Sequence, residues 1–433
     1  MGSSPKLVLI LILGLGLRLV NINQSLWLDE ASQAQMSSLS LTQIWTARGG
    51  DFHPPLFYFL AHFWLQLGHS EIWLRLLPVS FGVLNILVVY RLAQKLVSRG
   101  HLAALLMAVA PFHIYYSQEF RAYSLLSLLG TLSMYFLLRQ KYLWLALVNT
   151  LLLYTHYSSV FLILAQFIIH PVVIYYLPFT ALLYLPWIPQ FSLQLQAGAN
   201  IDAVLPGWRS VLSIAPLKAF PVTIFKLVAG RISFLNRYLY GLYVVFVFAV
   251  TFAAVFFAKL HQRFLLVWAF GPIFIMLAVS FAFPQNQPFR VIFVLPALVL
   301  LFTQAIMRFP KSFFTLLFYI AVVGNVAYFT RPRLQREQWR QAAAFLSSQS
   351  APVIVKFSGP FAPLTWYAPN LTILPALPSL PALPYPKVFL LEYLTGLTDP
   401  TRQIDRRLGE LGYREDRVHN FEGVGFIYEY TRP

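Results

Sequence analysis

The stretch YLYGLYVVFVFAVTFAAVFFA, Tyr238 to Ala258, runs without a single charged side chain. A helix of about 20 apolar residues crosses the hydrocarbon core of a bilayer, whereas a barrel strand needs only about ten. Comparable runs recur from Lys6 to Phe329, and the chain is 58% hydrophobic and 11% charged. Soluble domains carry about a quarter of charged residues. Because lipid permits only helices and closed barrels, these long runs predict a polytopic helical membrane protein.

About eleven transmembrane helices are predicted from the length of the apolar runs. A shorter membrane or interfacial helix is expected at Pro55–Leu67, and the helix count over residues 157–191 is left open. The predicted spans are Lys6–Ile22, Leu74–Val97, Leu102–Tyr116, Tyr123–Leu138, Tyr142–Tyr154, Val160–Tyr176, Leu177–Phe191, Tyr238–Ala258, Phe264–Phe283, Phe289–Met307 and Phe313–Phe329.

Two features narrow the class of protein further. The chain has no cysteine, which excludes disulfides, thiolate metal sites and thiol nucleophiles. The first apolar run, Leu7 to Val20, is followed by no small-residue cleavage site, so it is expected to be a retained membrane helix.

The formal net charge of +17 is distributed unevenly over the predicted topology. Cytoplasmic loops of membrane proteins collect Lys and Arg. With the N-terminus inside, the short basic hinges fall on the inner side, and the six acids before residue 330 fall on the outer side: Asp29, Glu30, Asp51, Glu71, Glu119 and Asp202. Several arginines also face outward, against the rule, so an anionic ligand or pairing with these acids is needed to explain them. Nucleic-acid binding is not predicted.

The composition changes after Phe329, where residues 330–433 hold twelve Lys/Arg and nine Asp/Glu. Two domains are therefore predicted: a membrane domain over residues 1–329 and a small extracytoplasmic α/β domain over residues 330–433. Leu374–Pro386 is expected to be a stiff, proline-punctuated connector. The predicted helices are Gln338–Ser348 and Arg402–Leu411, and the predicted strands are Pro352–Phe357, Lys387–Tyr393 and Gly425–Tyr430.

Three stretches on the predicted outer side hold the unusual chemistry: WLDEA (Trp27–Ala31), DFHPPLFYFLAHFW (Asp51–Trp64) and YYSQEFRAYSL (Tyr115–Leu125). A carboxylate beside the membrane can accept a proton from a hydroxyl or an amine. Arginine presents a planar fork of donors that suits phosphate oxygens. A site with both groups at the level of the lipid headgroups suits transfer from a lipid-linked phosphate.

These stretches, in this order, resemble the bacterial relatives of the protein O-mannosyltransferases and the lipid A aminoarabinose transferases. Those are GT-C glycosyltransferases that use polyprenyl-phosphate sugars, and the similarity in layout covers the whole membrane part. The segment QWRQAAAFL followed by a small outer domain also fits this family.

The resemblance implies roles for individual residues. Asp29 would be the general base on the acceptor, and Glu30 would orient the site, with Arg121 as its suggested partner. Arg290, in PFRVIFVLP, would bind the lipid phosphate. The remaining candidates for substrate or phosphate binding are His53, Glu119, His156, Arg231 and Arg237, the last two from a long loop, Gln190–Arg237, that is expected to cover the site.

The sequence therefore predicts an enzyme of the plasma membrane of a prokaryote. It would transfer a sugar from a polyprenyl-phosphate donor to an acceptor hydroxyl or amine at the outer face, by inverting single displacement. The sugar, the acceptor (glycan, lipid or protein) and the oligomeric state are left open. No cofactor is required, although a divalent cation remains an option. The alternative is a flippase or transporter for lipid-linked saccharides, which should show inverted repeats and charges at mid-span.

Overall fold

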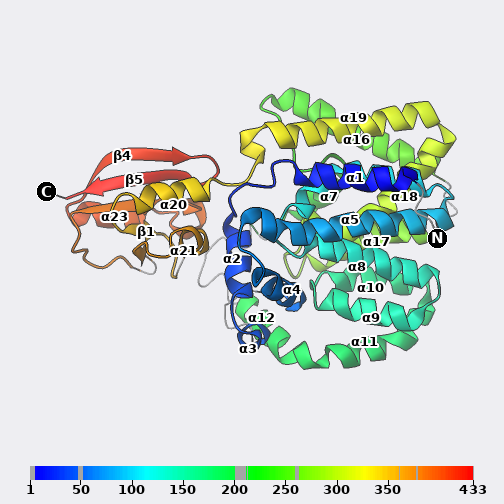
Figure 1. Ribbon diagram of the computed structural model, residues 1–433, viewed down its shortest axis with the longest axis horizontal. Helices are drawn as coiled ribbons and strands as arrows, with labels where there is room; N and C mark the ends of the chain where they lie inside the picture. The colour runs from blue at the N-terminus through cyan, green and yellow to red at the C-terminus, as the bar shows by residue number, and fades with distance from the viewer. Residues whose placement is uncertain are drawn as a thin grey trace.

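The computed structural model describes residues 5–46, 52–199, 211, 213–258, 263–359, 361–376 and 379–432. A large helical part contains the N-terminus, and a smaller part built around a β-sheet contains the C-terminus (Figure 1). We call these the membrane domain and the C-terminal domain. Asp51 and Asp202 lie outside the described residues.

Helices form the membrane domain. Its α-helices are α1 (Pro5–Leu19), α2 (Leu28–Ser37), α3 (Leu41–Trp45), α4 (Leu56–Leu65), α5 (Glu71–Leu96), α6 (Gly100–Val109), α7 (Pro111–Ser117), α8 (Tyr123–Leu138), α9 (Tyr142–Leu153), α10 (Ser159–Ile169), α11 (Leu177–Tyr184), α12 (Ile188–Ala199), α15 (Pro216–Ala229), α16 (Arg237–Phe257), α17 (Arg263–Val279), α18 (Leu295–Arg308) and α19 (Pro310–Thr330). Short 3-10 helices are η1 (Pro171–Tyr176), η2 (Leu185–Trp187) and η3 (Pro288–Val294).

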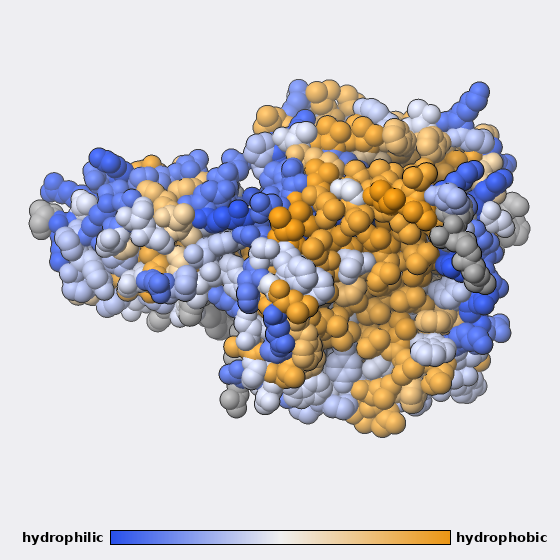
Figure 2. Space-filling view, in the orientation of Figure 1, coloured by the Kyte–Doolittle hydropathy of each residue, from blue (hydrophilic) through white to orange (hydrophobic). Residues whose placement is uncertain are grey.

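Five helical stretches of the described chain are long and apolar enough to cross a membrane: Glu71–Leu96, Pro171–Ala199, Arg237–Phe257, Pro288–Arg308 and Pro310–Thr330. Six shorter apolar helices, of 10–17 residues, accompany them. An apolar band covers the membrane domain between two polar ends (Figure 2). The predicted class, an all-helical multi-pass membrane protein, is confirmed, and the count of eleven spans stays a prediction.

Two helix boundaries differ from the prediction, and both lie at prolines. The predicted span Leu102–Tyr116 is broken into α6 and α7 at Pro111, because proline lacks the N–H that continues a helix. The helix that starts at Pro171 continues to Ala199, so the break between two predicted spans lies at His170 rather than after Tyr176. The predicted outer loop also contains a 14-residue helix, α15, which packs against α7 and α19.

The C-terminal domain is a five-stranded mixed sheet with helices on both faces. Strand order is β2-β1-β3-β5-β4; β1 is parallel to β2 and β3, and the other pairs are antiparallel. The strands are β1 (Val353–Val355), β2 (Ile373–Pro375), β3 (Lys387–Leu391), β4 (Arg414–Phe421) and β5 (Gly425–Thr431). The helices are η4 (Pro332–Leu334), α20 (Trp339–Ser347), α21 (Ala362–Tyr367), α22 (Thr395–Thr398) and α23 (Gln403–Glu410).

Alternation along the strands produces the two cores of this domain. Val353 and Val355 pack with α20 on one face, while Ile354 packs with α23 on the other. Two strands, β2 and β4, were not predicted, and both are edge strands of the sheet. The charged strand β4 is mostly exposed, so it carries no apolar pattern, and β2 is a three-residue strand that runs into the proline-rich connector.

Helix α2 lies at the junction of the two domains and contacts α4 on one side and α21 on the other (Figure 1). The hydroxyl of Tyr367, from α21, accepts the backbone N–H of Leu26 at 2.6 Å and donates to Glu71 at 2.9 Å. Arg340, from α20, forms an ion pair with the same Glu71 at 2.7 Å. The C-terminal domain therefore contacts both the segment that leads into α2 and the first residue of α5.

Candidate active site at the domain junction

The neighbouring carboxylates Asp29 and Glu30 open helix α2 and point to different surroundings. Adjacent residues in an α-helix are rotated by about 100° around its axis. Glu30 is fully buried, whereas Asp29 is half-buried. The helix separates the two groups, so one can anchor the helix while the other remains accessible.

Glu30 anchors α2 through a buried ion pair with Arg75 of α5. The Arg75 Nε donates to Glu30 at 2.9 Å, and the backbone N–H of Phe120 donates to it at 2.7 Å. Arg75 also donates to the backbone carbonyls of Ile22 and Ser25. Burial acts to raise the pKa of the Glu30 carboxyl, but the charge and hydrogen bonds of Arg75 outweigh it, so the pKa lies below its ordinary value.

The suggested pairing of Glu30 with Arg121 is wrong. Arg121 contacts the backbone carbonyl of Asp29 at 3.4 Å and the His53 Nε2 at 3.3 Å. The reason is the helical rotation described above: the side chain of Glu30 points toward α5, away from the side that Arg121 approaches. Arg121 thus lies beside Asp29 rather than beside Glu30.

The Asp29 carboxylate has no hydrogen bond or ion pair with the described residues, although it is surrounded by polar groups. The Tyr123 hydroxyl interacts electrostatically with both Arg121 and Asp29. On the other side, Asp29 interacts electrostatically with Glu337 and Tyr393 of the C-terminal domain. Asp29 therefore lies between the surface of the membrane domain and the C-terminal domain.

Two predicted histidines and Arg290 lie next to this position. The rings of His53 and His156 are 5.6 Å apart, and His156 lies 6.2 Å from the ring of Tyr123. The Ser158 hydroxyl is 2.8 Å from the His156 Nδ1 and 2.6 Å from the backbone carbonyl of Arg290. These contacts join residues from the second and third stretches with two later segments.

The partners of Arg290 set it apart from other arginines of the junction. Its guanidinium donates to the backbone carbonyl of Pro284 at 3.3 Å, and no carboxylate in the described chain pairs with it. Arg75 and Arg336, by contrast, each form a buried ion pair. Arg290 is partly buried and retains donors for an anion.

Glu119 and Arg231 belong to a second cluster, around the ring of Tyr115. Arg336 pairs with Glu119 at 2.9 Å and donates to the Tyr115 hydroxyl at 2.6 Å. Arg231 donates to the same hydroxyl at 2.7 Å. Both guanidiniums lie over the Tyr115 ring, that of Arg231 at 4.6 Å and that of Arg336 at 4.1 Å from its centroid. Arg237 is exposed at the start of α16 and joins neither cluster among the described residues.

Sequence reasoning missed the roles of Arg75, Arg336 and Glu337. Arg75 follows Glu71 by one helical turn at the start of an apolar run, where an arginine needs a partner. Arg336 and Glu337 stand together just after the last predicted span, and this charged pair was the available signal. Their partners lie some 200 to 300 residues away in sequence, which no local pattern reveals.

The described residues contain no group of three or more His, Cys, Asp or Glu side chains placed to hold a metal ion.

Known proteins resemble this chain in fold rather than in sequence. No protein-family model and no curated protein sequence matches the chain. The crystal structure of ArnT from Cupriavidus metallidurans in the apo state has a TM-score of 0.60 and 12% sequence identity, covering 98% of this chain and 97% of that one. The same protein bound to undecaprenyl phosphate gives a TM-score of 0.57 at 12% identity, covering 99% and 98%.

Proposed function

With the GT-C fold of ArnT as the premise, we propose that this chain transfers a sugar from a polyprenyl-phosphate donor to an acceptor at the outer face of the membrane. One observation carries the proposal: the Asp29 carboxylate is accessible and lacks a partner in the described chain, while its neighbour Glu30 is locked in a buried ion pair. A carboxylate held on a rigid helix without a structural partner is suited to act on a substrate. The solved structure of ArnT with undecaprenyl phosphate supports a lipid-phosphate donor.

In the proposed reaction, Asp29 accepts the proton of an acceptor hydroxyl or amine as that group attacks the anomeric carbon. The bond from the anomeric carbon to the phosphate oxygen breaks, and the lipid phosphate leaves with the electron pair. A positioned general base typically contributes about a hundred- to ten-thousand-fold in rate. A single displacement inverts the configuration at the anomeric carbon.

Arg290 is proposed to stabilise the departing phosphate. Cations aimed at the position where negative charge develops are a strong source of transition-state stabilisation. Arg121 lies closer to Asp29 and is proposed to hold the base and His53 in position rather than to hold the lipid. The two arginines therefore differ in their expected effects.

The substitution Asp29→Asn tests the proposal. The amide keeps the shape of the side chain but is a far weaker base, so turnover of a polyprenyl-phosphate sugar should fall about a hundred- to ten-thousand-fold. Binding of undecaprenyl phosphate should remain. Asp416→Asn, on the exposed strand β4, is the matched control and should behave like the parent.

The rival function, transport of a lipid-linked saccharide, predicts a different result. A transporter would move a labelled lipid-linked sugar across the bilayer of a proteoliposome without breaking the sugar–phosphate bond. Near-parental turnover by folded Asp29→Asn protein would remove Asp29 from the mechanism. Movement of the donor without cleavage in the parent would favour the transporter over the transferase.

A further inference from the structure

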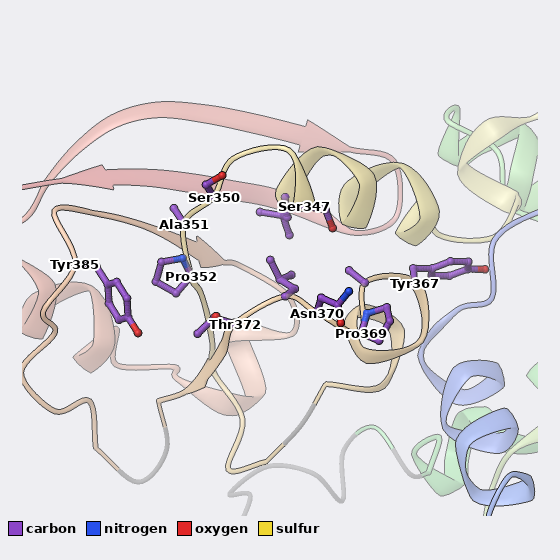
Figure 3. Close-up of a pocket in the computed structure, with 12 residues that line it drawn as sticks. Ser347, Ser350, Ala351, Pro352, Tyr367, Pro369, Asn370, Thr372 and Tyr385 are labelled. Atoms are coloured by element: carbon purple, nitrogen blue, oxygen red, sulfur yellow. The ribbon is translucent and has the colours of Figure 1, made fainter.

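Among its described residues, the C-terminal domain contains two cavities of different lining. The larger, about 580 Å³, lies between the end of α20, the start of β1 and the edge strand β2. Figure 3 shows that Tyr367, among its lining residues, is directed toward the membrane domain, whereas Asn370 and Thr372 lie around the cavity itself. None of the described residues that line it hydrogen-bonds with Asp29, which makes it the control cavity for the experiment.

The second cavity, about 440 Å³, is an open pocket at the turn between β4 and β5. Figure 1 shows this turn at the end of the C-terminal domain that faces the membrane domain. Glu337 and Tyr393 form one wall, and Asn420, Phe421, Glu422 and Gly423 form the other. The pocket is therefore built by two segments that meet at the junction.

The β4–β5 turn packs directly against Glu337 and Gln338. The backbone N–H of Gln338 donates to the Glu422 carbonyl at 3.0 Å, and the Gln338 side chain accepts the Glu422 N–H at 3.1 Å. Gly423 has φ +77°, and a Cβ there would lie 3.0 Å from the Glu337 Cα. Only glycine fits this conformation at this separation.

The Glu337 wall reaches the helix that carries Asp29. The Glu337 carboxylate accepts hydrogen bonds from the Tyr393 hydroxyl at 2.9 Å and from the Trp339 indole, and the Glu337 backbone carbonyl accepts one from the Ser25 hydroxyl at 2.8 Å. Leu28, the first residue of α2, packs against the hydrophobic cluster that contains Trp339 and Tyr393. Both Glu337 and Tyr393 interact electrostatically with Asp29. One wall of the pocket thus contacts the segment that leads into α2, the helix that carries the proposed base.

The lining defines a chemical class of ligand. It holds two carboxylates, an amide and a phenol, and no Lys, Arg or His. Such groups accept hydrogen bonds from hydroxyls and repel phosphate or carboxylate. Phe421 and Leu394 add apolar surface that suits the C–H face of a sugar ring. The Glu422 carboxylate is exposed and has no hydrogen bond or ion pair within the described chain, which leaves it available to a ligand.

We infer that the pocket at the β4–β5 turn is the acceptor site and takes a hydroxyl-rich saccharide that carries no anionic group. This inference rests on the proposed function. Asp29 then lies between a donor side, formed by the membrane domain, and an acceptor side, formed by the C-terminal domain. The acceptor hydroxyl enters from the pocket and delivers its proton to Asp29.

Saturation-transfer NMR on the full chain in nanodiscs tests the inference with maltotriose and glucose 6-phosphate as probes. Maltotriose should bind the parent, and the phosphorylated sugar should not. Glu422→Ala should weaken maltotriose binding roughly tenfold, the effect of losing one hydrogen bond to a charged group. Asn370→Ala, in the control cavity, should bind like the parent.

Three results would overturn the inference: no maltotriose signal, an equal signal in parent and Glu422→Ala, or glucose 6-phosphate binding as tightly as maltotriose. The assay requires no turnover, so it separates the two proposals. Asp29→Asn should bind maltotriose normally. If maltotriose binds as expected but the parent turns over no polyprenyl-phosphate sugar, the proposed reaction fails while the saccharide site stands.

Discussion

Replacement of Arg75 by methionine should destabilise the protein by about 3–5 kcal/mol, the usual loss when one partner of a buried ion pair is removed. Arg75 is 1% exposed and Glu30 is 0% exposed, so water cannot replace the lost guanidinium. The carboxylate would keep only backbone donors, chiefly the N–H of Phe120. Since domains are stable by about 5–15 kcal/mol, this is a large fraction.

The chain contains a matched control in the pair between Arg340 and Glu71. The Arg340 side chain is 40% exposed, so Arg340→Met should cost about 0–1 kcal/mol, the range of surface ion pairs. The two variants remove the same chemical group from two different environments. Unfolding by SDS titration in mixed micelles, followed by far-UV circular dichroism, compares them.

A second variant isolates the buried charge from the lost packing. In Glu30→Gln/Arg75→Met, no uncompensated charge remains, so this protein should be about 1–3 kcal/mol more stable than Arg75→Met alone. Equal losses for Arg75→Met and Arg340→Met, or a double variant no more stable than the single one, would refute the anchoring role of the pair.

The remaining predictions concern pH, the lipid phosphate and topology. Because the pKa of Glu30 is lowered in the folded state, its contribution to stability is present above its unfolded pKa of about 4.3 and is lost as pH falls. The midpoint of unfolding in the SDS titration should therefore drop from pH 5 to pH 3, and it should drop less in Glu30→Gln. Arg290→Ala should weaken undecaprenyl phosphate binding about tenfold or more, and Arg290→Lys should recover part of that binding. Arg121→Ala should instead lower turnover more than lipid affinity. If the Arg290→Ala protein binds the lipid as tightly as the parent, the phosphate lies elsewhere. In this cysteine-free chain, Asp416→Cys should react with an impermeant thiol reagent in intact cells and Lys141→Cys only after lysis; the reverse pattern would invert the topology.

Sequence patterns were sufficient for the class of fold and for much of the C-terminal domain. Apolar runs identify membrane helices because the bilayer imposes one length and one polarity on each of them. The helix Tyr123–Leu138 and the strand starting at Lys387 were predicted because their periodicity is local. The edge strands β2 and β4 were not, because an edge has little burial to record in its sequence.

Residue types, predicted sidedness and the family resemblance together indicated the candidate site. A pair of carboxylates after the first span, with an arginine after the third, is visible in the sequence, and tertiary structure brings Asp29, Arg121 and His53 together. The residue pattern did not separate the two adjacent acids, and only the family resemblance gave Asp29 the role of base and Glu30 an orienting role. Their difference arises from a helical rotation of about 100°, which directs Glu30 to a buried arginine and leaves Asp29 accessible.

Only the tertiary structure decided how the C-terminal domain takes part in the site. Glu337 accepts a hydrogen bond from Ser25, 312 residues earlier in the chain and just before α2, and it lines a pocket together with the β4–β5 turn. A sequence records the local preferences of helices and strands. It does not record which distant side chains share a buried carboxylate, because that pairing depends on how whole domains pack.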